Sequence, residues 1–178
     1  VATRGMDHLR NRVTLEINAR VNDDPAFKTA LYGGVVSAKP NSYEGKEFAV
    51  RKCENTFAVG DSVGMCRFDT KLFNSPTLPD TADFAEQVNT LTGTHLSAAE
   101  MDEIGRNVTG IEHMLNFRLG LRAKDDTLPK RLLTEPAKTG PAKGLVNKLP
   151  EMLPKYYAAR GWDADGQLKP ETRSRLGL

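Results

Sequence analysis

The feature that most constrains the fold is a long apolar repeat in the second half of the 178-residue chain. Apolar side chains return there every three or four residues, at Met101, Ile104, Val108, Ile111, Leu115 and Leu119. This spacing matches the period of an α-helix and places all six side chains on one face. Because such a stripe is nearly always part of a hydrophobic core, we expect it to be buried.

The start of this helix is marked by its own residues. Ser97 and Glu100 have capping-box spacing, in which the serine oxygen accepts an amide of the first turn and the glutamate reaches back to the serine amide. Gly105 and Gly110 lie inside the helix, where each costs about 1 kcal/mol relative to alanine. We therefore expect these two glycines to permit close contact with another helix.

Four further segments carry helix start and stop signals. They run from Asp23 to Tyr32, with Asp24 as the cap, from Ser42 to Val59, from Asp80 to Gly93 and from Pro150 to Arg160. No strand-like alternation and no internal repeat occurs. We predict an all-α, predominantly helical fold with long irregular connections, and the length suits one domain over residues 1–178.

Composition excludes several classes of function. Hydrophobic residues make up 39% of the chain, and no apolar run approaches the ~20 residues that a membrane span requires. A net charge of +2 does not indicate a nucleic-acid partner. The start of the sequence does not resemble a signal peptide, so the two cysteines are expected to be reduced thiols in the cytoplasm.

Two stretches remain as candidates for chemistry. The octet Asp61–Phe68 contains a carboxylate, a glycine and a thiol, and the loop Arg4–Arg10 combines arginines with a glycine and a histidine. Arginines beside a glycine can approach an anion closely, although a solvated loop is the alternative. The three histidines lack zinc-site spacing. Cys53 lies on an apolar helix stripe, where a buried structural thiol is the usual explanation.

Several blocks of the sequence resemble one known family. Asp61–Cys66 reads Asp-Ser-Val-Gly-Met-Cys and resembles the Asp-x-x-Gly-Leu-Cys motif of the tungsten-containing aldehyde ferredoxin oxidoreductase family. Arg4–His8 resembles its Arg-Gly-x-x-His loop, Lys124–Arg131 its Arg-Asp-Asp-x-Leu-Pro-x-Arg stretch, and Glu151–Leu178 its C-terminal signature. These blocks follow the family order. The resemblance implies the helical C-terminal domain, about the last third of a catalytic subunit, without the N-terminal pterin-binding and middle domains.

The resemblance also implies which residues bind the pterin cofactor. Asp61 and the backbone at Met65 would contact a pterin, and Arg4 and Arg10 would hold pterin or phosphate groups. Guanidinium groups suit phosphate because they donate paired hydrogen bonds. Met65 departs from the leucine usual in the family, which matters little if only its backbone is used.

Two residues are implied in metal chemistry. Cys66 would supply one thiolate of a [4Fe–4S] cluster, and His8 would be catalytic, assisting proton transfer near the metal. The other three thiolates are expected from a Cys-x-x-Cys-x-x-x-Cys run in the preceding domain. The isolated chain is therefore expected to bind no cofactor and to be inactive.

The implied function is oxidation of an aldehyde to a carboxylic acid by a tungsten (or molybdenum) bis-pterin, with ferredoxin as electron acceptor. The implied partners are the missing N-terminal domains of the same polypeptide, ferredoxin and the aldehyde; a homo-oligomer stays open. One alternative is an aromatic acyl-CoA reductase subunit of the same superfamily. Another is a helical interaction module without catalysis.

Overall fold

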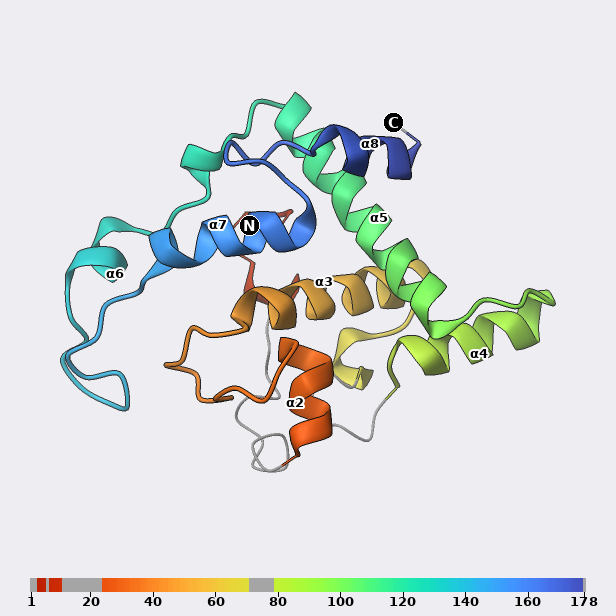
Figure 1. Ribbon diagram of the computed structural model, residues 1–178, viewed down its shortest axis with the longest axis horizontal. Coiled ribbons are helices and arrows are strands. Elements are labelled where there is room, and N and C mark those ends of the chain that lie inside the picture. Colours follow the sequence, from red (N-terminus) through yellow and green to blue (C-terminus); the bar gives the residue numbers. More distant parts are fainter. Residues whose placement is uncertain (1–2, 6, 11–23, 71–78, 178) are drawn as a thin grey trace.

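The computed structural model describes residues 3–5, 7–10, 24–70 and 79–177 (Figure 1). The α-helices in this part are α2 (Pro25–Tyr32), α3 (Lys46–Ser62), α4 (Thr81–Thr92), α5 (Ala98–Arg118), α6 (Lys130–Thr134), α7 (Leu149–Arg160) and α8 (Pro170–Leu176). Short 3-10 turns form η1 (His8–Arg10), η3 (Arg67–Asp69) and η4 (Ala123–Asp125). β Pairing within the described residues is limited to two isolated bridges. The predicted all-α fold is confirmed.

Helix α3 is the centre of the arrangement. Helices α2 and α7 lie on opposite sides of it in Figure 1, and α5 crosses it while α4 projects away beyond α5. Side chains of α3 reach three hydrophobic clusters: Cys53 and Phe57 pack with α2, Val59 packs with α4 and α5, and Val50 borders the cluster under α7. The C-terminus of this buried helix therefore holds the octet in a fixed place. None of the described helices combines the length and the apolar character needed to cross a membrane.

Three of the helix starts predicted from capping residues are confirmed. Asp24 accepts hydrogen bonds from two amides of α2. Asp80 caps α4, and Ser97 forms the predicted capping box with Glu100 at the start of α5. These starts were predictable because each depends on hydrogen bonds within one turn of the chain.

The boundaries predicted for α3 are wrong at both ends. The helix begins at Lys46 and not near Ser42, because Gly45 adopts a left-handed conformation with a φ of 73°. A side chain at Gly45 would lie 2.9 Å from the Cβ of Tyr32, so the chain must turn here before it can become helical. At the other end the helix continues through Gly60 to Ser62.

The apolar stripe of α5 is largely exposed, which contradicts the prediction that it forms core. Met101 is buried, whereas Ile111, Leu115 and Leu119 are 47%, 55% and 76% exposed. The buried positions further along α5 are Gly105, Thr109 and Gly110. Periodicity identified the helix correctly, but close packing against α3 buries the face with small residues and leaves the apolar face open.

Among the described glycines, Gly105 leaves the least room for a side chain, which agrees with its predicted role in a close helix contact. A Cβ at this position would lie 2.2 Å from the backbone oxygen of Asn55 in α3. Replacing Gly105 with alanine should therefore destabilise the chain by about 1–3 kcal/mol despite the helix propensity that alanine adds. Urea unfolding measures this change.

Gly34→Ala is the matched control for this substitution. Gly34 has open space where a Cβ would go and does not adopt a left-handed φ. Its replacement should leave stability unchanged or raise it by about 0.4–1 kcal/mol. Equal effects of the two substitutions would contradict the assigned contact between α3 and α5.

Trp162 packs back on α7 and also stacks on His113 of α5. The two rings lie 3.5 Å apart with an interplanar angle of 10°, and the Nε2 atom of His113 lies 2.5 Å from the Gly166 oxygen. Burial lowers the pKa of His113 below its ordinary value of 6.5 because the charged imidazolium is poorly solvated there. The neutral ring is therefore the form that the fold stabilises.

This lowered pKa predicts a specific pH dependence of stability. The unfolded chain binds a proton at His113 more readily than the folded chain does. The contribution of His113 to the free energy of unfolding is therefore fully present above pH 6.5 and is lost as the pH drops from 6.5 towards the folded pKa. The slope should not exceed about 1.4 kcal/mol per pH unit. Urea unfolding followed by fluorescence of Trp162 measures it. His113→Asn should remove this loss, while His95→Asn, at an exposed position, should retain it.

Candidate functional site

The octet is built around the end of α3. The amide of Met65 donates to the Gly60 oxygen at 2.8 Å, and the amide of Gly64 donates to the Asp61 oxygen at 3.3 Å. With Gly64 at a φ of 77°, these bonds form a Schellman motif, and the Met65 side chain packs on the cluster that contains Val59. The glycine and the apolar residue of the octet thus end the helix and direct the following chain outwards.

Asp61 carries a negative charge in the last turn of α3, where the helix dipole disfavours it. Two guanidinium groups compensate this charge. Arg67 donates to both carboxylate oxygens, with the Nε atom 3.0 Å from Oδ1, and Arg10 approaches Oδ2 at 3.2 Å. Because an ionised carboxylate accepts up to about four hydrogen bonds, Asp61 retains capacity for a further donor.

Arg10 links the N-terminal loop to two helices. Its Nη1 atom lies 2.9 Å from both carboxylate oxygens of Glu112 in α5, while Nη2 faces Asp61 at the end of α3. Its Nε atom is buried and has no hydrogen-bond partner among the described residues. The cleft around these groups measures about 10 Å³, which is room for one water molecule at most.

The loop before Arg10 is held by its own hydrogen bonds. Asp7 accepts the amide of Leu9 at 2.9 Å, a bond that lowers the pKa of the Asp7 carboxyl, with a further contribution from Arg4. Arg67 donates to the Leu9 oxygen at 3.3 Å and so ties the loop to the octet. Arg4 is mostly exposed and forms an ion pair with Asp7.

The structure therefore places the predicted site residues unequally. Arg10 and Asp61 are in contact, and Met65 and Cys66 follow Asp61 through the same turn. Arg4 interacts with Asp7 and has no recorded bond to Asp61 within the described chain. The backbone of His8 begins η1, but its side chain lies outside the described part of the structure.

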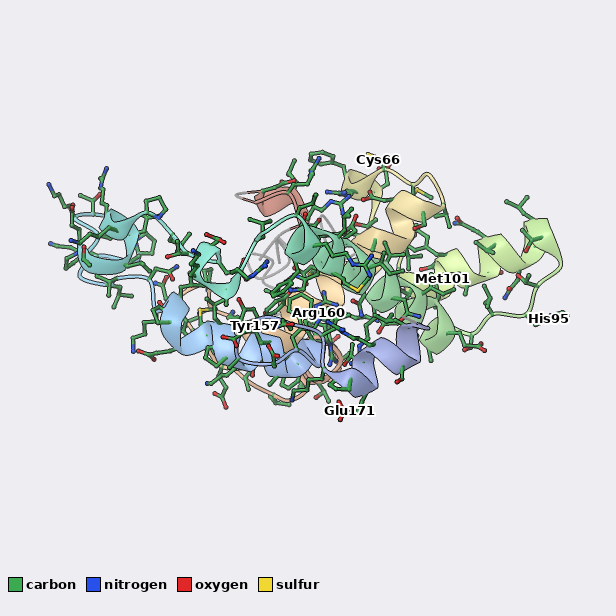
Figure 2. All side chains as sticks on the ribbon, turned by 90° about the horizontal axis from the view of Figure 1, so that it is seen from above. Cys66, His95, Met101, Tyr157, Arg160 and Glu171 are labelled. Atoms are coloured by element: carbon green, nitrogen blue, oxygen red, sulfur yellow. The ribbon has the colours of Figure 1, made fainter. Side chains whose placement is uncertain are left out.

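The two cysteines differ in burial, and the predicted burial of Cys53 is confirmed. Cys66 is a free, exposed thiol at the edge of the molecule in Figure 2, and Cys53 is fully buried in the cluster shared by α2 and α3. Among the described residues, no group of three or more His, Cys, Asp or Glu side chains could hold a metal ion. The thiol at position 66 is accessible but does not belong to such a group in the described part.

Two charged residues that contact Asp61 or Arg10 were missed by the sequence reasoning. Arg67 lies inside the octet but was given no role, although an arginine six residues after an aspartate across a helix end can fold back on it. Glu112 is 102 residues from Arg10 in the sequence. In the sequence it is a charged residue between Ile111 and Leu115 of the apolar stripe, and this position does not identify its partner.

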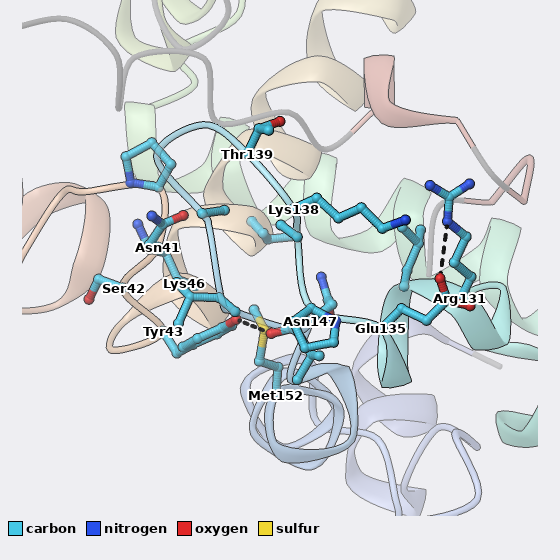
Figure 3. A pocket seen from close by; sticks show the side chains of 18 residues that line it. Asn41, Ser42, Tyr43, Lys46, Arg131, Glu135, Lys138, Thr139, Asn147 and Met152 are labelled. Carbon is cyan, nitrogen blue, oxygen red and sulfur yellow. Dashed lines mark hydrogen bonds and ion pairs between the residues drawn. The ribbon is translucent and has the colours of Figure 1, made fainter.

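A much larger groove lies elsewhere, between the loop before α3 and the arm around α6 (Figure 3). Its volume is about 740 Å³. Tyr43 donates to the Val146 oxygen and Asn41 to the Pro141 oxygen, so hydrogen bonds hold the two walls together. None of the predicted site residues lines this groove.

Comparison with known proteins identifies the family. A family model described as aldehyde ferredoxin oxidoreductase, domains 2 & 3, matches residues 1–178. The chain belongs to the aldehyde ferredoxin oxidoreductase family. Tungsten-containing aldehyde ferredoxin oxidoreductases from Pyrococcus abyssi and Thermococcus kodakarensis are 39% and 38% identical to it over 122 residues. Each match covers 68% of this chain and 19% of the relative.

A solved structure supports the fold assignment. The active site complex BamBC of benzoyl coenzyme A reductase, in complex with 1,5-dienoyl-CoA, matches with a TM-score of 0.61 and 21% identity. The match covers 78% of this chain and 20% of that one. The described protein thus shares its fold with part of a chain of that complex.

The residues at the end of α3 fit part of what the family's cofactors require. An exposed thiol at Cys66 suits a metal or cluster ligand, since thiolates hold iron–sulfur clusters. The partly exposed side chains of Arg10 and Asp61 offer a positive charge and a hydrogen-bond acceptor to a polar group. Because the cleft between them admits only about one water, a pterin would lie over these groups rather than within the chain.

Proposed function

We propose that this chain is the C-terminal part of a longer oxidoreductase that converts aldehydes to carboxylic acids, with ferredoxin as electron acceptor, in the cytoplasm. The observation that carries the proposal is the family match over residues 1–178 together with the exposed Cys66 at the octet turn. The chain spans about a fifth of the length of its curated relatives. Most of the active site is therefore proposed to come from the rest of the polypeptide.

Four residues would hold the pterin through their polar groups. Asp61 would accept hydrogen bonds from ring N–H groups, and the guanidinium of Arg10, whose side chain is 21% exposed, would attract a phosphate or ring oxygen. Arg4 could exchange its exposed pairing with Asp7 for a phosphate. Met65 would contribute its carbonyl, because its amide already donates to Gly60.

Cys66 and His8 would serve the redox centre. The Cys66 thiolate would be one ligand of a [4Fe–4S] cluster, and three further thiolates would come from upstream residues. His8 would accept the proton released during oxidation, which imidazole can do near neutral pH. When bound, tungsten (or molybdenum) would supply the two-electron chemistry and the cluster would relay electrons to ferredoxin. We infer that the 178-residue chain alone is inactive.

The full-length protein, purified without oxygen, provides the test. We expect tungsten or molybdenum and iron to copurify with it in stoichiometric amounts, and aldehyde-dependent reduction of ferredoxin. Metal without aldehyde oxidation would contradict the assigned reaction. The absence of tungsten, molybdenum and iron would favour a helical interaction module instead.

A second candidate is an aromatic acyl-CoA reductase subunit. The observation that favours it is the shared fold with the benzoyl coenzyme A reductase complex. The same preparation, supplied with a strong reductant and an aromatic acyl-CoA thioester, distinguishes the two. Ring reduction without aldehyde oxidation would support this candidate, and the reverse result would support the first.

A further inference from the structure

One face of α5 presents a row of exposed apolar side chains. Ile104, Ile111, Leu115 and Leu119 are 37%, 47%, 55% and 76% exposed and recur at helical spacing. We refer to these four residues as the open stripe. A contiguous apolar row on a helix is a typical docking surface, unlike apolar residues scattered singly over a protein.

The other sides of α5 are covered within the described residues. Gly105 and Thr109 face α3, and a Cβ at Gly110 would lie 3.0 Å from Leu176 of α8. Helix α4 packs on the beginning of α5. The open stripe is therefore the remaining side of a helix that is otherwise built into the fold.

The candidate site borders this stripe. Glu112, next to Ile111 in the sequence, binds Arg10, which in turn contacts Asp61. A body that covered the open stripe would consequently reach the groups at the end of α3. Docking at the stripe and completion of the site are thus geometrically coupled.

The N-terminal residues also run beside the stripe. The side-chain amide of Asn116, one residue after Leu115, donates to the backbone oxygen of Thr3 at 2.7 Å. The matched family model comprises domains 2 & 3, and the curated relatives are about five times as long as the part matched here. A polypeptide that preceded Thr3 would therefore enter this part of the structure close to α5.

We propose that the upstream part of the full-length polypeptide packs an apolar surface on the open stripe and is thereby positioned over Asp61 and Cys66. This rests on the proposed function only in taking the chain as part of a longer protein. The occupant presents uncharged side chains to the centre of the stripe, because a charge buried against isoleucine and leucine would be unpaired. Its rim faces the charged pair Arg10 and Glu112.

Site-specific photo-crosslinking in the full-length protein tests this proposal. A photoreactive phenylalanine analogue replaces Ile111 or Leu115, and the cross-linked peptides are identified by mass spectrometry. Leu132 in α6 is the matched control, because it is 48% exposed but belongs to the arm that lines the large groove. We expect cross-links from positions 111 and 115 to upstream residues, at least about fivefold more abundant than from position 132, because interface cores pack as densely as protein interiors.

Three results would overturn the proposal. They are cross-links confined to residues 11–23 or 71–78 of this chain, cross-links only to a second copy, and a yield no higher than at Leu132. The readout requires no metal. A protein that lacks tungsten, molybdenum and iron, but still cross-links as expected, would contradict the proposed function while supporting the docking surface.

Discussion

Cys66→Ser in the full-length protein should abolish its iron–sulfur cluster. We expect iron to fall from roughly four atoms per chain to a small residue, because a serine hydroxyl is a far weaker cluster ligand than a thiolate. Aldehyde-dependent ferredoxin reduction should be lost with it. Iron analysis and the cluster's electron paramagnetic resonance signal measure the effect.

Cys53→Ala is the control for this experiment. Cys53 has no exposed surface and lies among the side chains of α2 and α3. Its truncation should cost stability, by about 1–2 kcal/mol, while iron content stays the same. Unchanged iron in the Cys66 variant, or equal iron loss in both variants, would refute the ligand assignment.

Arg160→Met should destabilise the 178-residue chain by about 3–5 kcal/mol, because it would leave the buried carboxylate of Glu54 without its cation. Arg160 lies near the centre of the molecule in Figure 2 and forms a buried ion pair with Glu54. It also donates to the Asn55 side chain at 2.7 Å and to the Tyr156 hydroxyl at 3.2 Å. Urea unfolding is the measurement.

Two further variants separate the ion pair from a general effect of removing an arginine. Arg173→Met, at an exposed position of α8, should change stability by less than about 0.5 kcal/mol. The double variant Glu54→Leu and Arg160→Met should be more stable than Arg160→Met alone, because no unpaired charge remains. A loss below about 1 kcal/mol for Arg160→Met would contradict a buried, coupled pair.

Local features of the fold were predictable from the sequence. Asp24, Asp80 and Ser97 cap helices through hydrogen bonds to amides two or three residues away, so a short window contains all of the necessary information. Gly105 was predicted to make a helix contact and does so against Asn55. The end of α3 was misplaced because Gly60 and Gly64 could each end the helix. The helix continues through Gly60, and Gly64 adopts the left-handed conformation after its end.

The buried face of α5 could not be predicted in the same way. Periodicity shows that a helix has an apolar face, but which face is covered depends on what packs against it. The open stripe has the apolar spacing of a core-facing side but is exposed, while Gly105 on another side of α5 meets α3. The same residues thus support both a wrong prediction and the docking proposal.

The candidate site was predictable in part. Asp61, Met65 and Cys66 form one local motif, and the resemblance assigned them roles that stay predictions until they are tested. The contact between Arg10 and Glu112 joins residues 102 positions apart, and no spacing rule relates them. It was therefore found only from the structure.

The central claim is that the turn carrying Asp61 and Cys66 is one wall of a cofactor site that upstream polypeptide completes. Iron and sulfide reconstitution under anaerobic conditions, applied in parallel to the 178-residue chain and to the full-length protein, tests it most directly. The claim predicts a stoichiometric cluster on the full-length protein and none on the 178-residue chain. A stoichiometric cluster on the 178-residue chain, or its absence from the full-length protein, would contradict it.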